Sequence, residues 1–368
     1  MTGLWRVAAA LLLGTSARAD VELVVLGPGD AMWSRFGHVF LRVGDRCYNF
    51  ASTPRYDPAF ARDYLCGRAR FRVVAESWTG AMRRSAMRDR SVWTRPLLLN
   101  DTELARLADD LARAVAPGNR DYLYEHQHDN CVTRLRDILD RATGGALRRP
   151  GLRGGTYRDA TLAHLAGALG PQICADLIAG SPQDVEPEPW EWCYLPERLD
   201  EVVAAATRAD GSRIAGARCA RHVRRAPPVQ DGSPYRGRIV LGLSAVTVAL
   251  ALLVSRRAGG ACLLLAAPLF AAAGLLLWAL PAISSVRDYA WSDNALLFWP
   301  CDVILVGVAW RRVCGRPGLT SFARRYLLAR LGVTACYVGA KLAGAFPQDN
   351  WTFVGAAALV LLAARVDR

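Results

Sequence analysis

The sequence has almost no lysine: among its 46 basic residues only Lys341 is a lysine, and all the others are arginines. No RNP motif, zinc-finger spacing or interleaving of basic and aromatic residues accompanies the net charge of +13, so the charge does not predict a nucleic-acid surface. Heavy use of alanine, arginine and glycine indicates a compositional bias instead. The sequence also has no CxxC pair and no metal-ligand cluster, which argues against zinc. We expect no cofactor, no metal and no nucleic-acid partner.

A dense disulfide framework is absent as well. The ten cysteines show no short repeated spacing, and pairing cannot be deduced from sequence. Six of them precede the strongly hydrophobic C-terminal part and four lie within it. An exported domain can form disulfides, so the pairing stays open.

The N-terminus has the features of an export signal. One positive charge within the first six residues is followed by an apolar run at 7–13 and by Ala17-Arg18-Ala19. Small residues at these two positions suit a signal peptidase, and the apolar run is too short to cross a bilayer. We predict a signal peptide at 1–19; an uncleaved anchor is the alternative.

Residues 20–235 have the pattern of a mixed α+β domain. Apolar runs at 21–26, 38–43 and 46–50 predict strands, and Gly44-Asp45 predicts a hairpin turn between the last two. A further strand is expected near 71–75. One helix is expected to open at 100–103, where Asn100 or Asp101 can serve as the N-cap. A second is expected after Asn130, where apolar residues recur at helical spacing.

The sequence from 236 to 368 predicts a five-helix transmembrane domain. Its candidate spans are 239–254, 258–286, 295–309, 326–345 and 352–364. Arginines gather in every second connection, while the intervening connections hold few charges, as the positive-inside rule requires. This pattern places the first 235 residues outside and the C-terminus in the cytoplasm, which agrees with the export signal.

Two short segments contain the residues that could take part in catalysis. One is Trp33–Leu41, which contains His38, and the other is His128–Arg134, which contains Cys131. A cysteine in the first turn of a helix has a lowered thiol pKa, because the free N–H groups stabilise the thiolate. A nearby histidine could complete a thiolate–imidazolium pair, and the same N–H groups could hold an oxyanion. Alternatively, Cys131 is a small core residue and His38 a structural strand histidine.

These segments resemble those of a known superfamily. Gly-His on a strand, followed much later by Asn-Cys at a helix start, resembles the permuted papain-like, NlpC-type proteins, including the lecithin:retinol acyltransferase branch. The whole chain resembles the Lnb lipoprotein N-acyltransferase family. The resemblance rests on Trp-Ser-x-Phe-Gly-His-x-Phe-Leu-Arg, on Cys-Tyr-Asn-Phe after the hairpin, on Asn-Cys-x-Thr-Arg-x-Arg-Asp-Ile-Leu and on the C-terminal helices.

The resemblance implies roles for individual residues. Cys131 would be the nucleophile and His38 the base. Asn49, on the strand after the histidine, would be the third polar group, with Ser34 as the rival orienter. Asn130 is a candidate for shaping the cysteine turn. Arg134, at i+3 from Cys131, could meet a phosphate or carboxylate, or be an ordinary structural arginine.

Charges within the hydrophobic part need an explanation, because intramembrane charges are costly. Asp302 and Lys341 could form a pair in the outer half of the membrane, or Lys341 could extend to the interface while Asp302 faces protein. Trp291 and Asn294, on an outer loop, are candidates for holding lipid or lipoprotein substrate.

The resemblance implies a multi-pass protein of the bacterial inner membrane with a periplasmic domain. It would move a fatty acyl chain from a membrane phospholipid, through a Cys131 thioester, to the α-amine of a diacylated lipoprotein. A membrane-tethered cysteine hydrolase of the NlpC type, acting on cell-wall peptides, is the alternative enzyme. A non-enzymatic exported scaffold is the third possibility.

Overall fold

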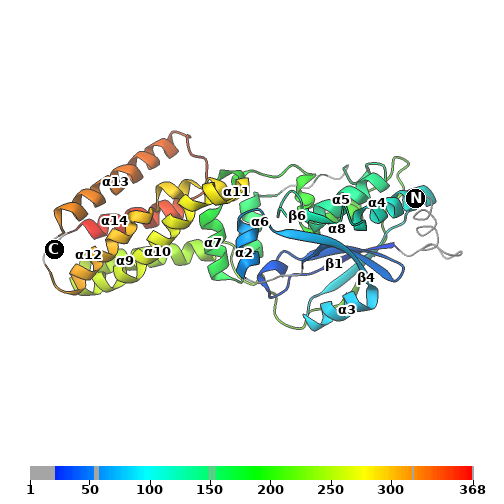
Figure 1. The fold of residues 1–368 in the computed structure, drawn as a ribbon, viewed down its shortest axis with the longest axis horizontal. Helices are drawn as coiled ribbons and strands as arrows, with labels where there is room; N and C mark the ends of the chain where they lie inside the picture. The colour runs from blue at the N-terminus through cyan, green and yellow to red at the C-terminus, as the bar shows by residue number, and fades with distance from the viewer. Residues whose placement is uncertain (1–20, 54–57, 149–150, 152–153, 317–318, 367–368) are drawn as a thin grey trace. The chain divides into compact units, whose positions relative to one another are not determined.

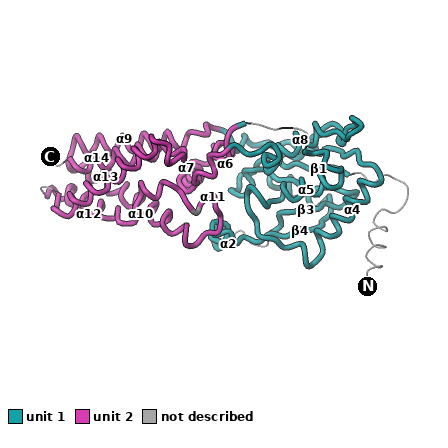
Figure 2. Tube along the Cα trace, turned by 90° about the horizontal axis from the view of Figure 1, so that it is seen from above, with its two compact units in different colours: residues 1–154, 186–231 teal, residues 155–185, 232–368 magenta. Residues whose placement is uncertain are grey.

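The computed structural model describes residues 21–53, 58–148, 151, 154–316 and 319–366. The predicted signal peptide therefore lies outside the described residues. The chain divides into two compact units (Figure 2): unit 1 comprises 1–154 and 186–231, and unit 2 comprises 155–185 and 232–368. We describe each unit by itself.

Unit 1 is an α+β domain built on a seven-stranded antiparallel sheet (Figure 1), in the order β6-β4-β3-β2-β1-β5-β7. The predicted hairpin joins β2 to β3 in the register Phe40 opposite Asn49. The strands are β1 Val21–Leu26, β2 His38–Val43, β3 Arg46–Ser52, β4 Arg70–Ser77, β5 Val92–Pro96, β6 Asp121–Leu123 and β7 Cys219–His222.

The central strand β1 is buried on both faces. Leu23 and Val25 belong to a large apolar core, while Val24 and Leu26 belong to a smaller one. This division follows from the two-residue period of a strand. The large core is covered by α4 (Asp101–Val115), α5 (Cys131–Ala142) and α8 (Pro196–Ala205), and the smaller one by α3 (Trp78–Met87). Among the described residues of unit 1, a further helix longer than one turn is α2, Pro58–Leu65.

Two helices of unit 1 begin with a reciprocal capping box. The Asn100 side chain accepts the N–H of Glu103 at the start of α4. The Asn130 side chain accepts the N–H groups of Val132 and Thr133 at the start of α5. An asparagine in this position satisfies N–H groups that a helix start leaves without partners. The cap therefore fixes where α5 begins, with Cys131 as its first residue.

Unit 2 is helical, and five of its helices correspond to the five hydrophobic segments. Two of them, α9 and α10, are long and apolar enough to cross a membrane by length and composition. The helices are α6 Tyr157–His164, α7 Leu169–Ile178, α9 Arg236–Val254, α10 Arg256–Ile283, α11 Arg287–Ala290, α12 Ile304–Val313, α13 Ser321–Leu342 and α14 Trp351–Arg365.

The third hydrophobic segment differs from the expected helix at 295–309. It forms two short 3-10 turns, Asp293–Leu296 and Pro300–Val303, before α12 begins at Ile304. Pro300 lacks an N–H, so it suits a helix start and disfavours an interior position. The regular helix that remains is too short to span a bilayer by itself, since a span needs about 20 residues.

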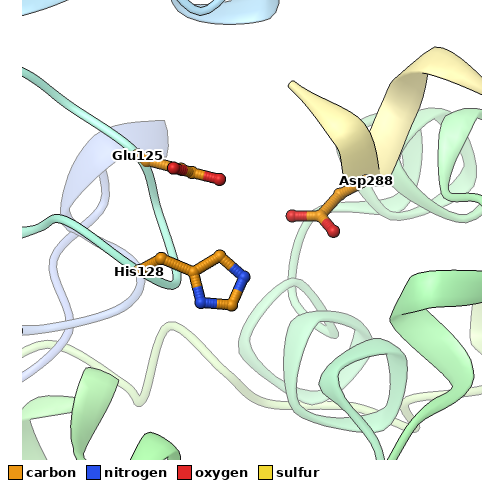
Figure 3. Close-up of side chains that lie close together, drawn as sticks. All are labelled: Glu125, His128 and Asp288. Carbon is orange, nitrogen blue, oxygen red and sulfur yellow. The ribbon is translucent and has the colours of Figure 1, made fainter. Parts of the chain in front are cut away.

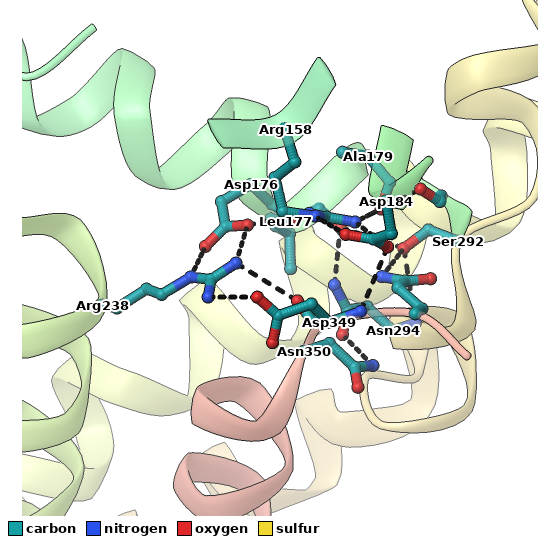
Figure 4. Close-up of polar contacts among 12 residues, drawn as sticks. Arg158, Asp176, Leu177, Ala179, Asp184, Arg238, Ser292, Asn294, Asp349 and Asn350 are labelled. Carbon is teal, nitrogen blue, oxygen red and sulfur yellow. Dashed lines mark hydrogen bonds and ion pairs between the residues drawn. The ribbon is translucent and has the colours of Figure 1, made fainter. Parts of the chain in front are cut away.

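Residues 155–185, which the sequence assigned to the soluble domain, group with the hydrophobic helices instead. A network of ion pairs explains this (Figure 4). Arg158 is 2% exposed and pairs with Asp176 at 2.8 Å and with Asp184 at 2.6 Å, and Arg238 of α9 bridges Asp176 and Asp349. These contacts join segments far apart in sequence, which composition alone does not reveal.

Candidate active site

The site is built where the start of α5 meets β2 and β3 in unit 1. Cys131 is 6% exposed, and Asn130 holds the turn that carries it. Besides capping the helix, the Asn130 amide donates to the carbonyl oxygens of His126, at 2.5 Å, and Tyr194, at 3.0 Å. All four hydrogen bonds of this side chain therefore fix the backbone from which the thiol projects.

The Cys131 thiol lies against the His38 imidazole. The Sγ of Cys131 is 3.2 Å from Nδ1 of His38, although the residues are separated by 93 positions in sequence. His38 is the first residue of β2, opposite Leu26 of β1. The strand end and the helix start thus place a base within hydrogen-bond reach of a nucleophile, the geometry required for activating a thiol.

Asn49 determines which imidazole nitrogen carries the proton. Its Oδ1 lies 2.9 Å from Nε2 of His38 and also accepts the N–H of Ala51, while its Nδ2 donates to Glu76. The Ala51 N–H can donate only to the oxygen of the Asn49 amide, and the Glu76 carboxylate can accept only from its nitrogen. These two contacts therefore assign the orientation of the Asn49 amide. Oδ1 can only accept, so Nε2 carries the hydrogen and the lone pair of Nδ1 points to the thiol.

Burial favours the neutral form of both the thiol and the imidazole. Burial lowers the pKa of His38 to about 4, helped by the positive charge of Arg90, while Asn49 opposes the shift. Burial raises the pKa of Cys131 to about 11, although the backbone N–H groups of Val39, Cys131 and Val132 and the charge of Arg90 oppose this increase. Desolvation is the largest influence on both groups, so it favours the neutral thiol and imidazole over a thiolate–imidazolium pair in the resting site.

The arrangement supports nucleophilic catalysis with a general base. His38 can take the thiol proton as the sulfur attacks, so charge develops only when an electrophile is present. The backbone N–H of Cys131 lies at the sulfur, where the oxygen of a tetrahedral intermediate would form. An N–H at this place can stabilise an oxyanion.

Comparison with known proteins identifies the domain that holds this site. Residues 12–161 match the family model described as the Lnb N-terminal periplasmic domain. Residues 12–161 are thus similar to an Lnb domain. This confirms the predicted resemblance to the Lnb family, and the matched stretch includes His38, Asn49 and Cys131. No curated protein and no solved structure matches the chain.

Two residues named from the sequence lie elsewhere in the Lnb domain. The Ser34 hydroxyl donates to the carbonyl oxygen of Ala31 at 2.7 Å, so Asn49 and not Ser34 contacts the histidine. The Arg134 guanidinium forms a bidentate pair with Asp129, at 2.5 and 2.8 Å, and stacks on the Tyr122 ring. This pairing corresponds to the structural alternative for Arg134, which braces the turn before α5.

Two further residues of the Lnb domain escaped the sequence reasoning. Arg90, which is 6% exposed, donates its Nε to the carbonyl oxygen of Gly27 and influences both site pKa values. Glu76 receives the Asn49 amide. Both residues come from distant parts of the sequence, and neither belongs to a recognisable motif.

The loop before α5 also carries Glu125 and His128, whose side chains lie near each other (Figure 3) within 4.8 Å between ligand atoms. Two protein ligands are fewer than a structural or catalytic zinc site requires. Asp288, drawn in the same figure, belongs to unit 2. His128 thus lies in a loop.

In unit 2, the possible pairing of Asp302 with Lys341 is not found. Asp302 pairs with Arg330, with Nε–Oδ1 at 2.9 Å and both side chains fully buried, and it accepts the Tyr326 hydroxyl at 2.7 Å. Lys341 donates instead to the carbonyl oxygens of Phe346, at 3.2 Å, and Gln348, closing the connection after α13. The sequence reasoning overlooked Arg330, which lies inside a predicted span.

Asn294 and Trp291, the two substrate-binding candidates in a loop of unit 2, differ in burial. Asn294 is fully buried, and its amide donates to the carbonyl oxygen of Leu177 while its Oδ1 accepts the Asn350 amide (Figure 4). Asn294 therefore ties the loop to α7 and α14. Trp291 is 74% exposed, so an apolar surface is available there.

Proposed function

We propose that this protein is a membrane lipoprotein N-acyltransferase in which Cys131 carries the acyl group as a thioester. One observation carries the proposal: in an Lnb domain, the Cys131 thiol meets the Nδ1 lone pair of a histidine whose tautomer is set by Asn49. Cys131 is the nucleophile, His38 the general base, Asn49 the orienting residue and Asn130 the residue that holds the nucleophile's turn.

In the first half-reaction a phospholipid donates the acyl group. As Cys131 Sγ attacks the ester carbonyl carbon, its proton passes to His38 Nδ1, and the carbonyl oxygen becomes an oxyanion near the Cys131 N–H. Collapse of this intermediate breaks the ester C–O bond. His38 returns the proton to the departing glyceryl oxygen, giving a lysophospholipid and the thioester.

In the second half-reaction a diacylated lipoprotein accepts the acyl group. The α-amine of its N-terminal diacylglyceryl-cysteine attacks the thioester carbon and loses a proton to His38. The C–S bond breaks, and the proton returns to sulfur, so the thiol is regenerated and the product is an N-acylated lipoprotein. Donor, acceptor and product balance without any other reactant.

The hydrophobic helices would place the active site at a membrane surface. Both substrates reside in a bilayer, and α9 and α10 have the length and composition of membrane spans. The arginine-rich connections support a periplasmic Lnb domain and a cytoplasmic C-terminus. The helices would hold the thiol at the outer surface of the inner membrane, where Trp291 would contact lipid.

The direct test is mass spectrometry of a lipoprotein N-terminus from cells with the wild-type protein, without it, and with Cys131→Ala or His38→Ala. We expect N-acylation only with the wild type. A donor phospholipid with isotope-labelled acyl chains should transfer its label to the lipoprotein amine. Unchanged lipoproteins together with altered cell-wall peptides in the Cys131→Ala strain would contradict the proposal and favour a hydrolase.

A further inference from the structure

In unit 1, the segment that follows β7 lies against the loop that presents His38. We call this segment, residues 223–231, the linker, because the chain continues from it to Gly232 and then to α9. The linker forms no helix or strand, so its conformation depends on contacts with the rest of unit 1. The loop that it contacts, residues 27–37, joins β1 to β2 and is named the site loop.

The turn after α3 fixes the start of the linker. The Asp89 carboxylate accepts the backbone N–H groups of Arg225 and Ala226. The Ser91 hydroxyl accepts the N–H of Arg224 at 2.9 Å. Asp89 has a φ of 45°, in the left-handed region that aspartate tolerates better than most residues other than glycine. The linker backbone is therefore held at three consecutive N–H groups.

The linker then holds the site loop at two places. The Arg224 guanidinium makes a bidentate pair with Asp30, at 2.8 and 3.2 Å. The Asp30 side chain is 71% exposed, so this ion pair alone contributes little. Further along, the Arg35 guanidinium donates to the carbonyl oxygen of Val229 at 2.8 Å, and the Gln230 amide donates to the carbonyl oxygen of Arg35 at 3.1 Å. Arg35 is thus bound through its side chain and its backbone to two consecutive linker residues.

Arg35 lies close to the point where the two halves of the active site meet. It is three residues before His38 in the sequence, and its neighbour Phe36 contacts the loop before α5. The Phe36 and His126 rings meet edge to face, with their centroids 4.3 Å apart. The carbonyl oxygen of His126 accepts the Asn130 amide that caps α5. A shift of Arg35 would therefore disturb the alignment of the imidazole with the thiol.

The backbone between Arg35 and His38 has little room to absorb such a shift. Gly37 has a φ of 75°, a conformation that glycine adopts at no steric cost. A Cβ built on Gly37 would lie 3.0 Å from the carbonyl oxygen of Leu26 and 3.1 Å from the Pro196 ring. Because β1 and α8 pack so closely around this residue, displacement of the site loop is passed on to the start of β2.

We propose that the linker aligns the His38 imidazole with the Cys131 thiol, with Arg35 and Gln230 as positioning residues. The proposal rests on the catalytic roles of His38 and Cys131, and not on the identity of the acyl donor or acceptor. Misplacement of a catalytic group by about 1 Å can lower a rate about 10²-fold. The segment that leads to α9 is then a support of the catalytic base as well as a connection.

A double-mutant cycle with His38 tests the proposal on the full-length protein in mild detergent. The substrate is p-nitrophenyl butyrate, an activated ester that a catalytic thiol can attack whatever its natural acyl donor. The burst of p-nitrophenolate, with release by Cys131→Ala subtracted, gives the acylation rate constant of the thiol. We expect His38→Ala to lower this constant about 10²-fold and Arg35→Ala/Gln230→Ala to lower it about tenfold. In the His38→Ala protein the two linker substitutions should have no further effect, because they act through the imidazole.

Arg72→Ala/Asn119→Ala is the matched control. It removes an arginine that donates to Asp121 and an amide that donates to the carbonyl oxygen of Arg113, both outside the linker and the site loop. This control should keep the wild-type rate constant, and its melting temperature shows how much the loss of comparable surface contacts affects stability.

Three results would overturn the proposal. Equal fractional losses from Arg35→Ala/Gln230→Ala in the wild-type and His38→Ala backgrounds would show that the contacts only stabilise the fold. A wild-type rate constant in Arg35→Ala/Gln230→Ala would show that they position nothing. Absence of a Cys131-dependent burst in the wild type would remove the catalytic thiol on which the proposal rests. The expected cycle together with lipoproteins that are not acylated would contradict only the acyltransferase proposal.

Discussion

At the scale of single residues, the site depends on a neutral thiol–imidazole pair. Burial disfavours charge on both His38 and Cys131, so the resting site stores no reactive thiolate. An electrophile that enters the site is attacked as the proton moves to Nδ1, and the N–H groups around the sulfur then stabilise the charge. Such a thiol is protected from indiscriminate alkylation and oxidation, because the thiolate is the reactive form.

Alkylation of Cys131 should therefore depend steeply on pH. With a thiol pKa of about 11, the thiolate fraction grows about tenfold per pH unit below that value. We expect the iodoacetamide rate at Cys131, followed by mass spectrometry of its peptide, to rise throughout pH 6–9. A plateau from about pH 5 upward would indicate a thiolate–imidazolium pair and contradict the neutral site.

Removing the Asn49 amide should impair catalysis more than folding. Asn49→Ala leaves the His38 tautomer and ring orientation unfixed, and misplacement of a catalytic group can cost about 10²-fold. We expect N-acylation of a lipoprotein to fall about that much. Asn119→Ala, which removes an exposed asparagine bonded to the carbonyl of Arg113, is the control and should keep wild-type activity. Equal activity of both variants would reject the orienting role.

At the scale of elements, the sequence contains clear information on where helices and strands begin. Asn100 and Asn130 were recognised as helix starts because asparagine is a preferred N-cap, and the β2–β3 hairpin followed from its Gly44-containing turn. The two 3-10 turns before α12 were missed, because hydropathy shows that a segment is apolar but not that its backbone is interrupted. Hydropathy also does not reveal the Asp302–Arg330 pair, because the two residues lie on different segments that meet only in the folded protein.

The two asparagine caps offer a matched comparison. Asn130→Ala and Asn100→Ala each remove a reciprocal capping box, which should lower the free energy of unfolding by about 1 kcal/mol. Asn130→Ala also removes two hydrogen bonds to carbonyl oxygens, so it should cost more. Only Asn130 also holds the turn that carries Cys131, so only Asn130→Ala should abolish most of the acyl transfer. Denaturant unfolding and a lipoprotein acylation assay measure the two effects. An equal loss of activity in Asn100→Ala would show that the loss in Asn130→Ala comes from reduced stability and not from the turn that carries Cys131.

The buried Asp302–Arg330 pair should stabilise unit 2 only as a pair. Asp302→Ala leaves the fully buried Arg330 without its carboxylate, which typically costs about 3–5 kcal/mol. The apolar double variant Asp302→Leu/Arg330→Met should recover most of the melting temperature in detergent. Arg324→Met, on the exposed side of α13, is the single-charge control. A wild-type melting temperature for Asp302→Ala would contradict the role of the pair.

At the scale of the whole molecule, the sequence predicted an exported domain at 20–235 followed by hydrophobic helices from 236 onward. The expected change at 235 lies close to the observed one at 231, yet residues 155–185 belong to the helical unit. Asp176 and Arg238 support that assignment through an ion pair between residues 62 positions apart in the sequence. Charge patterns along a sequence indicate topology, whereas such pairings depend on the folded arrangement.

The native cysteines can report the proposed topology. Cys219 of unit 1 and Cys314, directly after α12, are both exposed. A membrane-impermeant maleimide applied to intact spheroplasts should label Cys219 but not Cys314, and detergent should make Cys314 reactive. Mass spectrometry of the two peptides provides the readout. Labelling of Cys314 in intact spheroplasts would place this connection outside and contradict the assigned orientation.

Trapping the acyl-enzyme tests the central chemical step most directly. The purified protein, incubated with phospholipid vesicles and no lipoprotein, should gain the mass of one fatty acyl group on the peptide containing Cys131. Hydroxylamine should remove this mass, and added diacylated lipoprotein should take up the acyl group. His38→Ala should show no adduct. An adduct on any other cysteine, or acyl transfer that persists in Cys131→Ala, would contradict the thioester mechanism.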